Sequence, residues 1–306
     1  MIGIKNIGSY LPNSKKSNYD VLEKFEISES FVNKKLGIKN VRVKDKLDET
    51  SDLCIKAYKY LDEKERIAKN EIECLIVVTQ NPDYNLPHTS AIVHKKLGFS
   101  ENCACFDISL GCSGYVYGLS AIKSFMQENN IKKGLLFTAD PYSKIINPED
   151  KNTSMLFGDG ASVSLISDEP LFRLGKFSFG TIGERYESLI SKNGELHMDG
   201  FDIFSFASKY VPTDFEKVLN LNNISKDEVD YFVFHQGSKY IVDTLRKKLK
   251  LPKDKVLFDI EDYGNTVSSS IPMILEKIIE EDKKMNIFVS GFGVGLSWAS
   301  GIVYKR

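Results

Sequence analysis

The chain repeats part of its own sequence at a nearly constant spacing, and this constrains the fold more than any other feature. Residues 95–108 (KKLGFSENCACFDI) match residues 247–260 (KKLKLPKDKVLFDI) at Lys-Lys-Leu and at Phe-Asp-Ile, an offset of 152. Two further pairs match in the same order, NEIECLIVV (70–78) with DEVDYFVFH (227–235) and KKGLLFTAD (132–140) with KKMNIFVSG (283–291), at offsets of 157 and 151. Three ordered matches predict an internal duplication, so the 306 residues form two related halves.

Each copy alternates short apolar runs with helical patterns. Strands buried on both faces are predicted at Leu75–Val78, Ala104–Ile108, Leu135–Thr138, Tyr231–Phe234, Val256–Ile260 and Ile287–Ser290. Helical faces are predicted at Tyr115, Leu119, Ile122 and Met126, and at Ile271, Ile274, Leu275, Ile278 and Ile279. Strands that alternate with helices indicate a layered α/β fold with largely parallel sheets.

The two halves show no flexible linker between them. The Ser-Asp-Glu-Pro segment at 167–170 is the best boundary, so we predict one half at 1–168 and the other at 169–306. Because no Pro/Ser/Gly-rich stretch separates the copies, we expect the halves to pack closely together.

Charge and composition exclude several classes of protein. Lys and Arg number 41 against 42 Asp and Glu, so no global field attracts nucleic acid or an anionic membrane. No stretch reaches the ~18 apolar residues of a membrane span, and the N-terminus lacks a signal-peptide pattern. The five cysteines show no CxxC spacing, which argues against a disulfide framework and a structural metal. We expect a soluble cytoplasmic protein without a metal.

Three loops that follow predicted strands carry reactive residue types. Cys112 lies in SLGCSGY after the first Phe-Asp-Ile, and Asn265 lies at nearly the matching place after the second. His235 directly follows the strand YFVF. Since ligands bind at the carboxyl ends of strands in open α/β sheets, we expect these three residues to meet.

A thiol at a helix N-terminus predicts a nucleophile. The helix dipole and free N–H groups are expected to lower the pKa of Cys112, His235 can exchange the proton, and Asn265 can hold an oxygen or orient the ring. Taken singly, Cys112 could be a buried core residue, His235 a core histidine and Asn265 a turn residue. The flanking glycines and the repeat-matched position of Asn265 favour the chemical interpretation.

Two glycine-rich segments carry weaker signals. GFGVGL (291–296) lacks the G-x-G-x-x-G spacing and precedes a strand, so it is no dinucleotide site. It is better interpreted as a tight turn whose backbone amides form an oxyanion hole. FGDGA (157–161) is typical of a turn into a strand, which leaves Asp159 without a chemical role.

The order Cys, His, Asn also occurs in papain-like cysteine proteases. The gap between residues 112 and 235 is 123 residues, close to the interval in that family. Against this alternative, GCSGY lacks the sequence around the protease cysteine, and a protease would not explain the duplication.

The whole chain resembles the β-ketoacyl-acyl-carrier-protein synthase III family of the thiolase superfamily. The likeness runs from IGSYLPNSKKSN (7–18) to GFGVGLSWASGIVY (291–304) and includes LGI (36–38), LIVVTQ (75–80), FGDGA and HMDG (197–200). The resemblance implies a thiolase-like fold of two βαβαβαββ halves in five αβαβα layers, and a homodimer. It maps the catalytic triad to Cys112 in GCSG, His235 in HQ and Asn265 in YGNT.

The resemblance also implies a reaction. An acyl-CoA, which is a substrate and no cofactor, acylates Cys112, and a malonyl group on acyl carrier protein then loses carbon dioxide and attacks the acyl-cysteine. His235 and Asn265 would stabilise the enolate, and the backbone N–H groups of Cys112 and Val294 would form the other oxyanion hole.

Departures from the family lie at its substrate contacts. Phe31 and Lys151 stand where a Trp and an Arg sandwich the CoA adenine, and Ser238 replaces a CoA-contacting Asn. These positions keep an apolar plane and a cation but lose guanidinium stacking, so we expect weaker CoA binding.

The carrier-protein and acyl contacts depart as well. Tyr240 replaces an Arg that contacts the carrier protein, while Arg246, Lys247 and Lys248 could attract an acidic carrier or simply complement a helix dipole. Leu86 stands where a neighbouring subunit's aromatic side chain closes the acyl pocket, which suggests an altered chain-length preference.

Two alternatives share this fold. An acyltransferase could move the acyl group from Cys112 to a sugar, hydroxyl or amine without decarboxylation, but it would not need Asn265. A binding or scaffold protein without activity would not need the triad.

Overall fold

The computed structural model describes all residues 1–306, and the two halves follow a similar order of elements, except that the second half has no strand that corresponds to β5. The first half contains β1 (Gly3–Tyr10), α1 (Thr50–Glu65), β4 (Cys74–Val78), α2 (Thr89–Leu97), β5 (Ala104–Ile108), α3 (Gly114–Glu128), β6 (Lys133–Ala139) and β7 (Ala161–Ser167). The second contains β8 (Phe172–Thr181), α5 (Gly200–Asn222), β11 (Tyr231–Phe234), α6 (Lys239–Lys248), α7 (Ser270–Ile279), β12 (Met285–Gly293) and β13 (Ser297–Lys305).

Shorter helices and strands lie in the segments that connect these elements. They are β2 (Lys15–Ser17), η1 (Phe31–Leu36), β3 (Asn40–Arg42), η2 (Lys69–Glu71), η3 (Tyr142–Lys144), α4 (Lys151–Ser154), η4 (Gly183–Ser188), β9 (Leu189–Lys192), β10 (Glu195–Met198), η5 (Lys226–Glu228) and η6 (Val267–Ser269).

The strand order shows the duplication directly. The main sheet runs β11-β12-β13-β8-β1-β7-β6-β4-β5, and β1 joins β8 through only two residue pairs, Gly3 with Arg173 and Ile4 with Phe172. In each half the first strand lies at the centre of the sheet beside the last strand of that half. The next-to-last strand and then the second strand follow toward the edge. The repeat predicted from the sequence is therefore confirmed in the topology.

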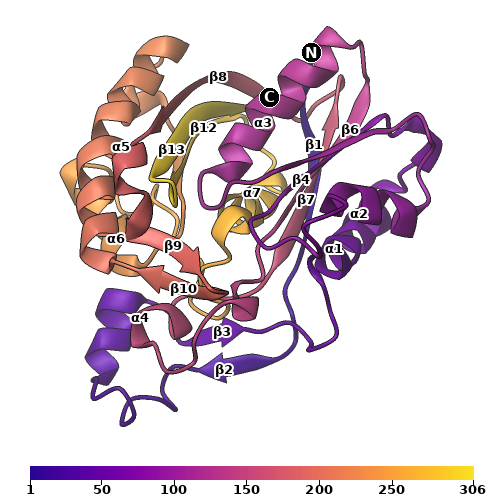
Figure 1. Ribbon diagram of the computed structural model, residues 1–306. Helices are drawn as coiled ribbons and strands as arrows, with labels where there is room; N and C mark the ends of the chain where they lie inside the picture. Colours follow the sequence, from indigo (N-terminus) through magenta and orange to yellow (C-terminus); the bar gives the residue numbers. More distant parts are fainter.

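The helices form three layers around the two halves of the sheet. Figure 1 shows α3 and α7 between them, with α1 and α2 on one outer side and α5 and α6 on the other. Both faces of the strand β4 are apolar because helices cover both of them. Ile76 and Val78 pack in the central cluster with α3 and α7, whereas Leu75 and Val77 pack with α1 and α2. The predicted αβαβα layering is confirmed.

Two details of the sheet prediction are wrong. Only the β4–β5, β4–β6 and β11–β12 pairs are parallel, whereas β12–β13 and the pairs that involve β1, β7 or β8 are antiparallel. The last two strands of each half have no crossover helix between them, and parallel neighbours require one. β5 lies at the edge of the sheet and is half-buried instead of covered on both faces.

The predicted strand Val256–Ile260 is also wrong, because it forms only one bridge, between Phe232 and Val256. The side chain of Gln236 makes hydrogen bonds to backbone groups of this segment that a neighbouring strand would otherwise make. Its Nε2 donates to the carbonyl of Leu257 at 3.2 Å, and its Oε1 accepts from the N–H of Asp259 at 3.1 Å. The chain therefore leaves the sheet early and turns toward Asn265.

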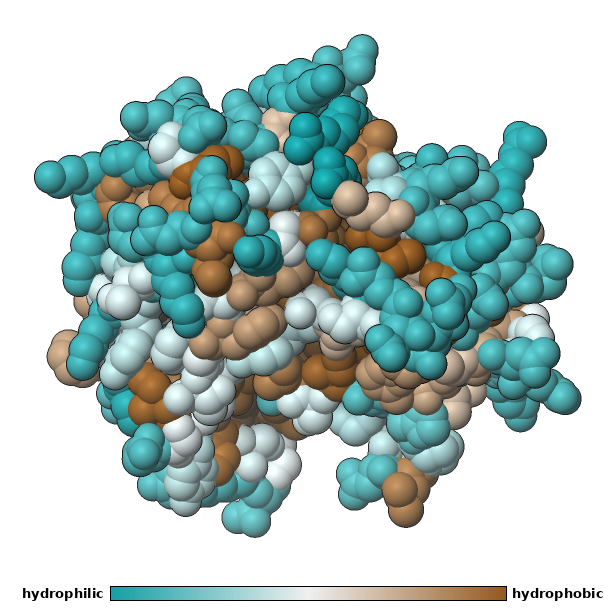
Figure 2. All heavy atoms as spheres, turned by 90° about the horizontal axis from the view of Figure 1, so that it is seen from above, coloured by the Kyte–Doolittle hydropathy of each residue, from teal (hydrophilic) through white to brown (hydrophobic).

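The link between the halves is short. β7 ends at Ser167 and β8 begins at Phe172, and the division that we predict at 168/169 falls between them. No helix combines the length and apolar character needed to cross a membrane. Figure 2 shows polar side chains over most of one face, with smaller apolar patches between them.

Candidate active site

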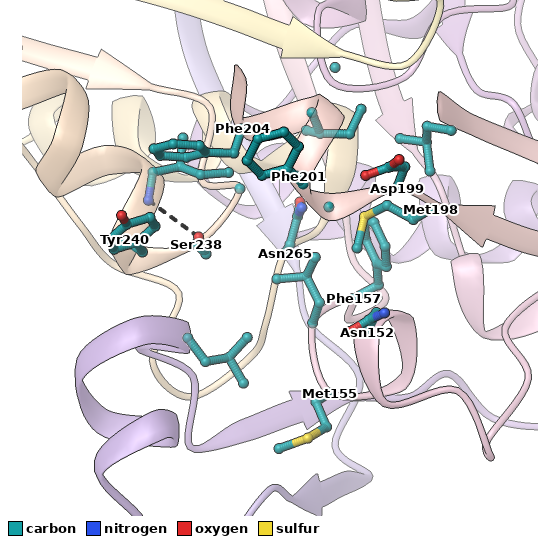
Figure 3. A pocket seen from close by; sticks show the side chains of 18 of the residues that line it. Asn152, Met155, Phe157, Met198, Asp199, Phe201, Phe204, Ser238, Tyr240 and Asn265 are labelled. Carbon is teal, nitrogen blue, oxygen red and sulfur yellow. Dashed lines mark hydrogen bonds between the residues drawn. The ribbon is translucent and has the colours of Figure 1, made fainter. Parts of the chain in front are cut away.

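A pocket of about 1160 Å³ brings together residues from both halves. Cys112 from the first half and His235 and Asn265 from the second all line it. Figure 3 shows Asn265 pointing into this pocket between Phe157 and Phe201. The three residues that the sequence singled out thus meet in one cavity.

Cys112 lies in the loop from β5 to α3 and is 4% exposed. The end of β12 packs against it through two glycines. A Cβ atom on Gly291 would lie 2.5 Å from the carbonyl oxygen of Cys112, and one on Gly293 would lie 2.7 Å from its Sγ. Only residues without a side chain allow β12 to approach the thiol this closely.

The thiol is protonated at neutral pH. Burial raises the pKa of Cys112 to about 12, and the charge of Asp140 adds to this, while the backbone N–H groups of Val294 and of Cys112 itself act in the opposite direction. The predicted lowering of the pKa by the helix terminus is therefore wrong, because desolvation outweighs the amides. Both amides of the predicted oxyanion hole face the sulfur.

His235 follows β11 and is held on both sides. Its Nδ1 lies 2.8 Å from the hydroxyl of Ser270, and its ring meets the ring of Phe292 edge to face at 5.7 Å. Burial lowers the pKa of His235 to about 3, so the imidazole is neutral at physiological pH. With Nδ1 engaged by Ser270, Nε2 is the nitrogen left to act in the pocket.

Asn265 is oriented by its own turn. Its Oδ1 accepts from the N–H of Val267 at 2.8 Å, which directs Nδ2 away from the turn, and Nδ2 lies 3.4 Å from His235 Nε2. When Nδ1 of the neutral ring of His235 accepts a hydrogen bond from the Ser270 hydroxyl, Nε2 carries the ring proton. Two N–H donors then converge on one point, which suits a negatively charged oxygen.

Three residues predicted to contact CoA line the same pocket. Phe31 comes from η1, Lys151 opens α4, and Ser238 precedes α6. The Ser238 hydroxyl accepts from the N–H of Ile241 at 3.3 Å, so it also caps α6.

Tyr240 and Leu86 differ in their relation to the pocket. Tyr240, 51% exposed, lines the pocket and stacks on Phe204, with 5.1 Å between ring centres. Figure 3 shows this pair beside Ser238. Leu86, 86% exposed, does not line the pocket of its own chain.

The basic residues at the end of α6 are separate from the pocket lining. Lys247 is exposed, Lys248 Nζ donates to the carbonyl of Ser208 at 2.7 Å, and Arg246 lies 3.7 Å from Asp243.

FGDGA acts structurally, as its sequence predicts. Asp159 accepts hydrogen bonds from the backbone N–H groups of Lys44 and Ser143 at 2.8 and 3.1 Å and from the Ser143 hydroxyl. It therefore ties the turn before β7 to two other loops.

Several residues around the nucleophile are not predicted from the sequence. Ser270 holds His235, and Asp140 is fully buried and acts on the charge of Cys112. Tyr142 belongs to the same buried cluster as Cys112 and donates a hydrogen bond to Gln80. Ser270 stands in the run SSS, and nothing in that run distinguishes the serine that reaches the histidine.

Comparisons with known proteins agree with this geometry. The family model described as 3-oxoacyl-[acyl-carrier-protein (ACP)] synthase III matches residues 106–183, and the model of its C-terminal part matches residues 219–305. A beta-ketoacyl-[acyl-carrier-protein] synthase III of Caldanaerobacter subterraneus is 33% identical over 98% of this chain and 97% of its own length. One from Lactococcus lactis is 32% identical over 98% of each chain.

Solved structures show the same fold. A crystal structure of a 3-oxoacyl-(acyl-carrier-protein) synthase III superposes with a TM-score of 0.94 at 32% identity, covering 99% of both chains. The synthase III of Thermus thermophilus gives 0.92 at 28% identity, with the same coverage. The thiolase-like fold and these relatives exclude the cysteine protease alternative. The chain belongs to the β-ketoacyl-acyl-carrier-protein synthase III family of condensing acyltransferases.

Proposed function

We propose that this chain takes an acyl group from acyl-CoA onto Cys112 and condenses it, with decarboxylation, with malonyl-acyl carrier protein. The observation that carries the proposal is the pair of donors, Asn265 Nδ2 and His235 Nε2, 3.4 Å apart in the pocket that contains the thiol. An enolate oxygen needs such neutral donors, whereas a simple acyl transfer does not.

In the first step the sulfur of Cys112 attacks the thioester carbonyl. A bond to the acyl carbon forms, the bond to the CoA sulfur breaks, and the thiol proton passes to the departing CoA sulfur. Because the pKa of Cys112 is about 12 and that of His235 about 3, both groups start neutral. His235 can only relay the proton, and the N–H groups of Cys112 and Val294 stabilise the intermediate oxyanion.

In the second step the malonyl group loses its carboxylate as carbon dioxide. The electron pair of the broken C–C bond enters an enolate whose oxygen accepts from His235 and Asn265. The enolate carbon attacks the acyl-cysteine, a new C–C bond forms, and the bond between the acyl carbon and the sulfur of Cys112 breaks. The sulfur then takes up one proton from water, because the original thiol proton left with CoA. The product is a β-ketoacyl thioester, and no cofactor takes part.

The pocket mouth supplies the contacts for CoA and the carrier protein. Phe31 offers an apolar ring, Lys151 a positive charge and Ser238 a hydroxyl group for contacts with CoA. Tyr240 at the rim offers stacking in place of an ion pair with the carrier. We expect CoA to bind more weakly than at a site with Trp and Arg, because guanidinium stacking is absent.

Further parts of the proposal concern assembly and location. We propose a cytoplasmic homodimer in which Leu86 of each subunit limits the acyl pocket of the other. Arg246, Lys247 and Lys248 would attract the acidic carrier protein through local charge, since the net charge of the chain is only −1.

Intact mass measurement tests the proposed function. Incubation with acetyl-CoA should add one acetyl group to the wild type and none to Cys112→Ser, and added malonyl-acyl carrier protein should yield a β-ketoacyl product. Absence of an adduct with every acyl-CoA would contradict the proposal. Acetylation followed by transfer to a hydroxyl or amine without carbon dioxide release would favour the non-decarboxylating acyltransferase.

A further inference from the structure

The turn that carries Asn265 contains a strained residue. Val267 is fully buried and has a φ of 54°, in the left-handed region that β-branched side chains rarely adopt. Such a conformation persists only where the surrounding structure holds it in place. Contacts of this turn with its neighbours must therefore offset the strain at Val267.

Both members of the donor pair depend on Val267. Its N–H donates to Asn265 Oδ1 at 2.8 Å, which directs Nδ2 away from the turn. Burial lowers the pKa of His235 to about 3, and the backbone of Val267 acts on the same ring in the opposite direction. Because Asn265 Nδ2 and His235 Nε2 lie 3.4 Å apart, a change of backbone conformation at Val267 would turn or separate the two donors.

Two serines that follow Val267 bind the end of β6 in the first half. The Ser268 hydroxyl donates to the carboxylate of Asp140. The Ser269 hydroxyl donates to the carbonyl of Thr138 at 3.0 Å and also lies 2.8 Å from the hydroxyl of Thr138. All four side chains are buried, so loss of either serine hydroxyl would leave a buried acceptor with one hydrogen bond fewer.

The end of β6 is a rigid support for these serines. Thr138 lies in β6, which pairs with β4 on one side and with β7 on the other. Asp140 follows the strand, and its carboxylate also accepts from the N–H of Gln80 at 2.7 Å. The turn at Val267 is therefore held by groups that the nucleophile's own half fixes in place.

We propose that Asp140 and Thr138, through the two serine hydroxyls, hold the strained turn at Val267 and thereby position the donor pair. The inference rests on the proposed function, in which this pair stabilises the enolate. Cys112 lies outside the turn, so its acylation should not depend on these contacts. Decarboxylation should depend on them, because it requires both donors to point at one oxygen.

The double variant Ser268→Ala/Ser269→Ala removes both hydroxyls and keeps the charge of Asp140. Its acetylation by acetyl-CoA, followed by intact mass, should match the wild type. Carbon dioxide release from malonyl-acyl carrier protein by the acetylated variant should be at least about tenfold slower in a single turnover. Release at the wild-type rate would overturn the proposal. Ser269→Ala alone is the milder variant, should the double variant not fold, and should slow release at least about threefold.

A matched pair of substitutions controls for the loss of two buried hydroxyls. The hydroxyls of Tyr115 and Ser164 lie 2.9 Å apart within the first half, and both side chains are buried. Tyr115→Phe/Ser164→Ala should leave acetylation and carbon dioxide release unchanged. Thermal unfolding shows whether each variant is folded.

A glycine tests the part played by strain. Because Gly adopts a positive φ without steric cost, Val267→Gly added to the double serine variant should raise its carbon dioxide release at least about fivefold. A triple variant that releases carbon dioxide no faster than the double variant would overturn the proposal, since the turn would then not depend on strain at Val267.

Crystal structures separate the positioning from the chemistry. In the double serine variant we expect Val267 to leave the left-handed region, or Asn265 Nδ2 to move away from His235 Nε2, which lies 3.4 Å from it in the wild type. An unchanged turn would overturn the proposal whatever the activity. A displaced pair, together with a wild type that releases no carbon dioxide from malonyl-acyl carrier protein, would contradict the proposed function instead.

Discussion

Asp140 places a negative charge near Cys112, whose thiol must give up its proton when it is acylated. Its side chain is fully buried, and it accepts from the N–H of Gln80 at 2.7 Å and from the hydroxyl of Ser268. Burial raises the pKa of Asp140 to about 6, and its carboxylate raises the pKa of Cys112. Above pH 6 the ionised carboxylate therefore opposes formation of the thiolate.

Replacing this carboxylate should make the thiol more reactive. Asp140→Asn removes the charge, so alkylation of Cys112 by iodoacetamide at pH 8 should accelerate at least about threefold. The acceleration should disappear as the pH falls below about 6, where Asp140 of the wild type is already protonated.

A matched substitution controls for the loss of a buried carboxylate. Asp159 is also buried, but its partners are Lys44 and Ser143. Asp159→Asn should leave the alkylation rate near that of wild type. Equal rates for Asp140→Asn and wild type at pH 8 would show that Asp140 does not act on the thiol.

At the scale of elements, the end of β12 sets how much room the thiol has. Gly293→Ala would place a Cβ atom 2.7 Å from Sγ of Cys112 and 2.9 Å from its Cβ. We expect acetylation of Cys112 to slow at least about a hundredfold, because either the strand or the thiol must shift from its reactive position.

The control for this change is another glycine. A Cβ atom on Gly183 meets no atom within 4 Å, so Gly183→Ala should acetylate like the wild type. Intact mass against time measures both variants, and far-ultraviolet circular dichroism reports whether they fold. A folded Gly293→Ala protein with a normal acetylation rate would disprove the close packing of β12 on Cys112.

The sequence predicts most elements because their patterns are local. The apolar runs at β4, β6, β11 and β12 are correctly identified as strands, since each is covered by helices on both faces. Val256–Ile260 has the same pattern but fails, because one distant side chain, Gln236, takes its backbone groups. Nothing local distinguishes the two cases.

At the scale of the whole molecule, the duplication predicts which loops meet but not their electrostatics. The matched positions of Cys112 and Asn265 indicate one shared site, and both line one pocket. The sequence places a helix N-terminus beside the thiol, yet the pKa rises because burial is a property of the assembled layers. Tyr142 and Gln80 are missed for the same reason, since their contact exists only after folding.

The layered arrangement explains why one half alone would not form this site. Cys112 precedes α3, Asn265 precedes α7, and these two helices share the central apolar cluster between the two halves of the main sheet. Packing of the two halves therefore fixes the distance between nucleophile and donor pair. The first half contributes the nucleophile Cys112, and the second half contributes both members of the donor pair, His235 and Asn265.

The central claim is that His235 and Asn265 stabilise the enolate formed opposite an acyl group on Cys112. It is tested most directly by carbon dioxide release in a single turnover from pre-acetylated enzyme and malonyl-acyl carrier protein. We predict prompt release by the wild type, and release at least about a hundredfold slower in Asn265→Ala that still acetylates on Cys112. Release at the wild-type rate from acetylated Asn265→Ala would contradict the account.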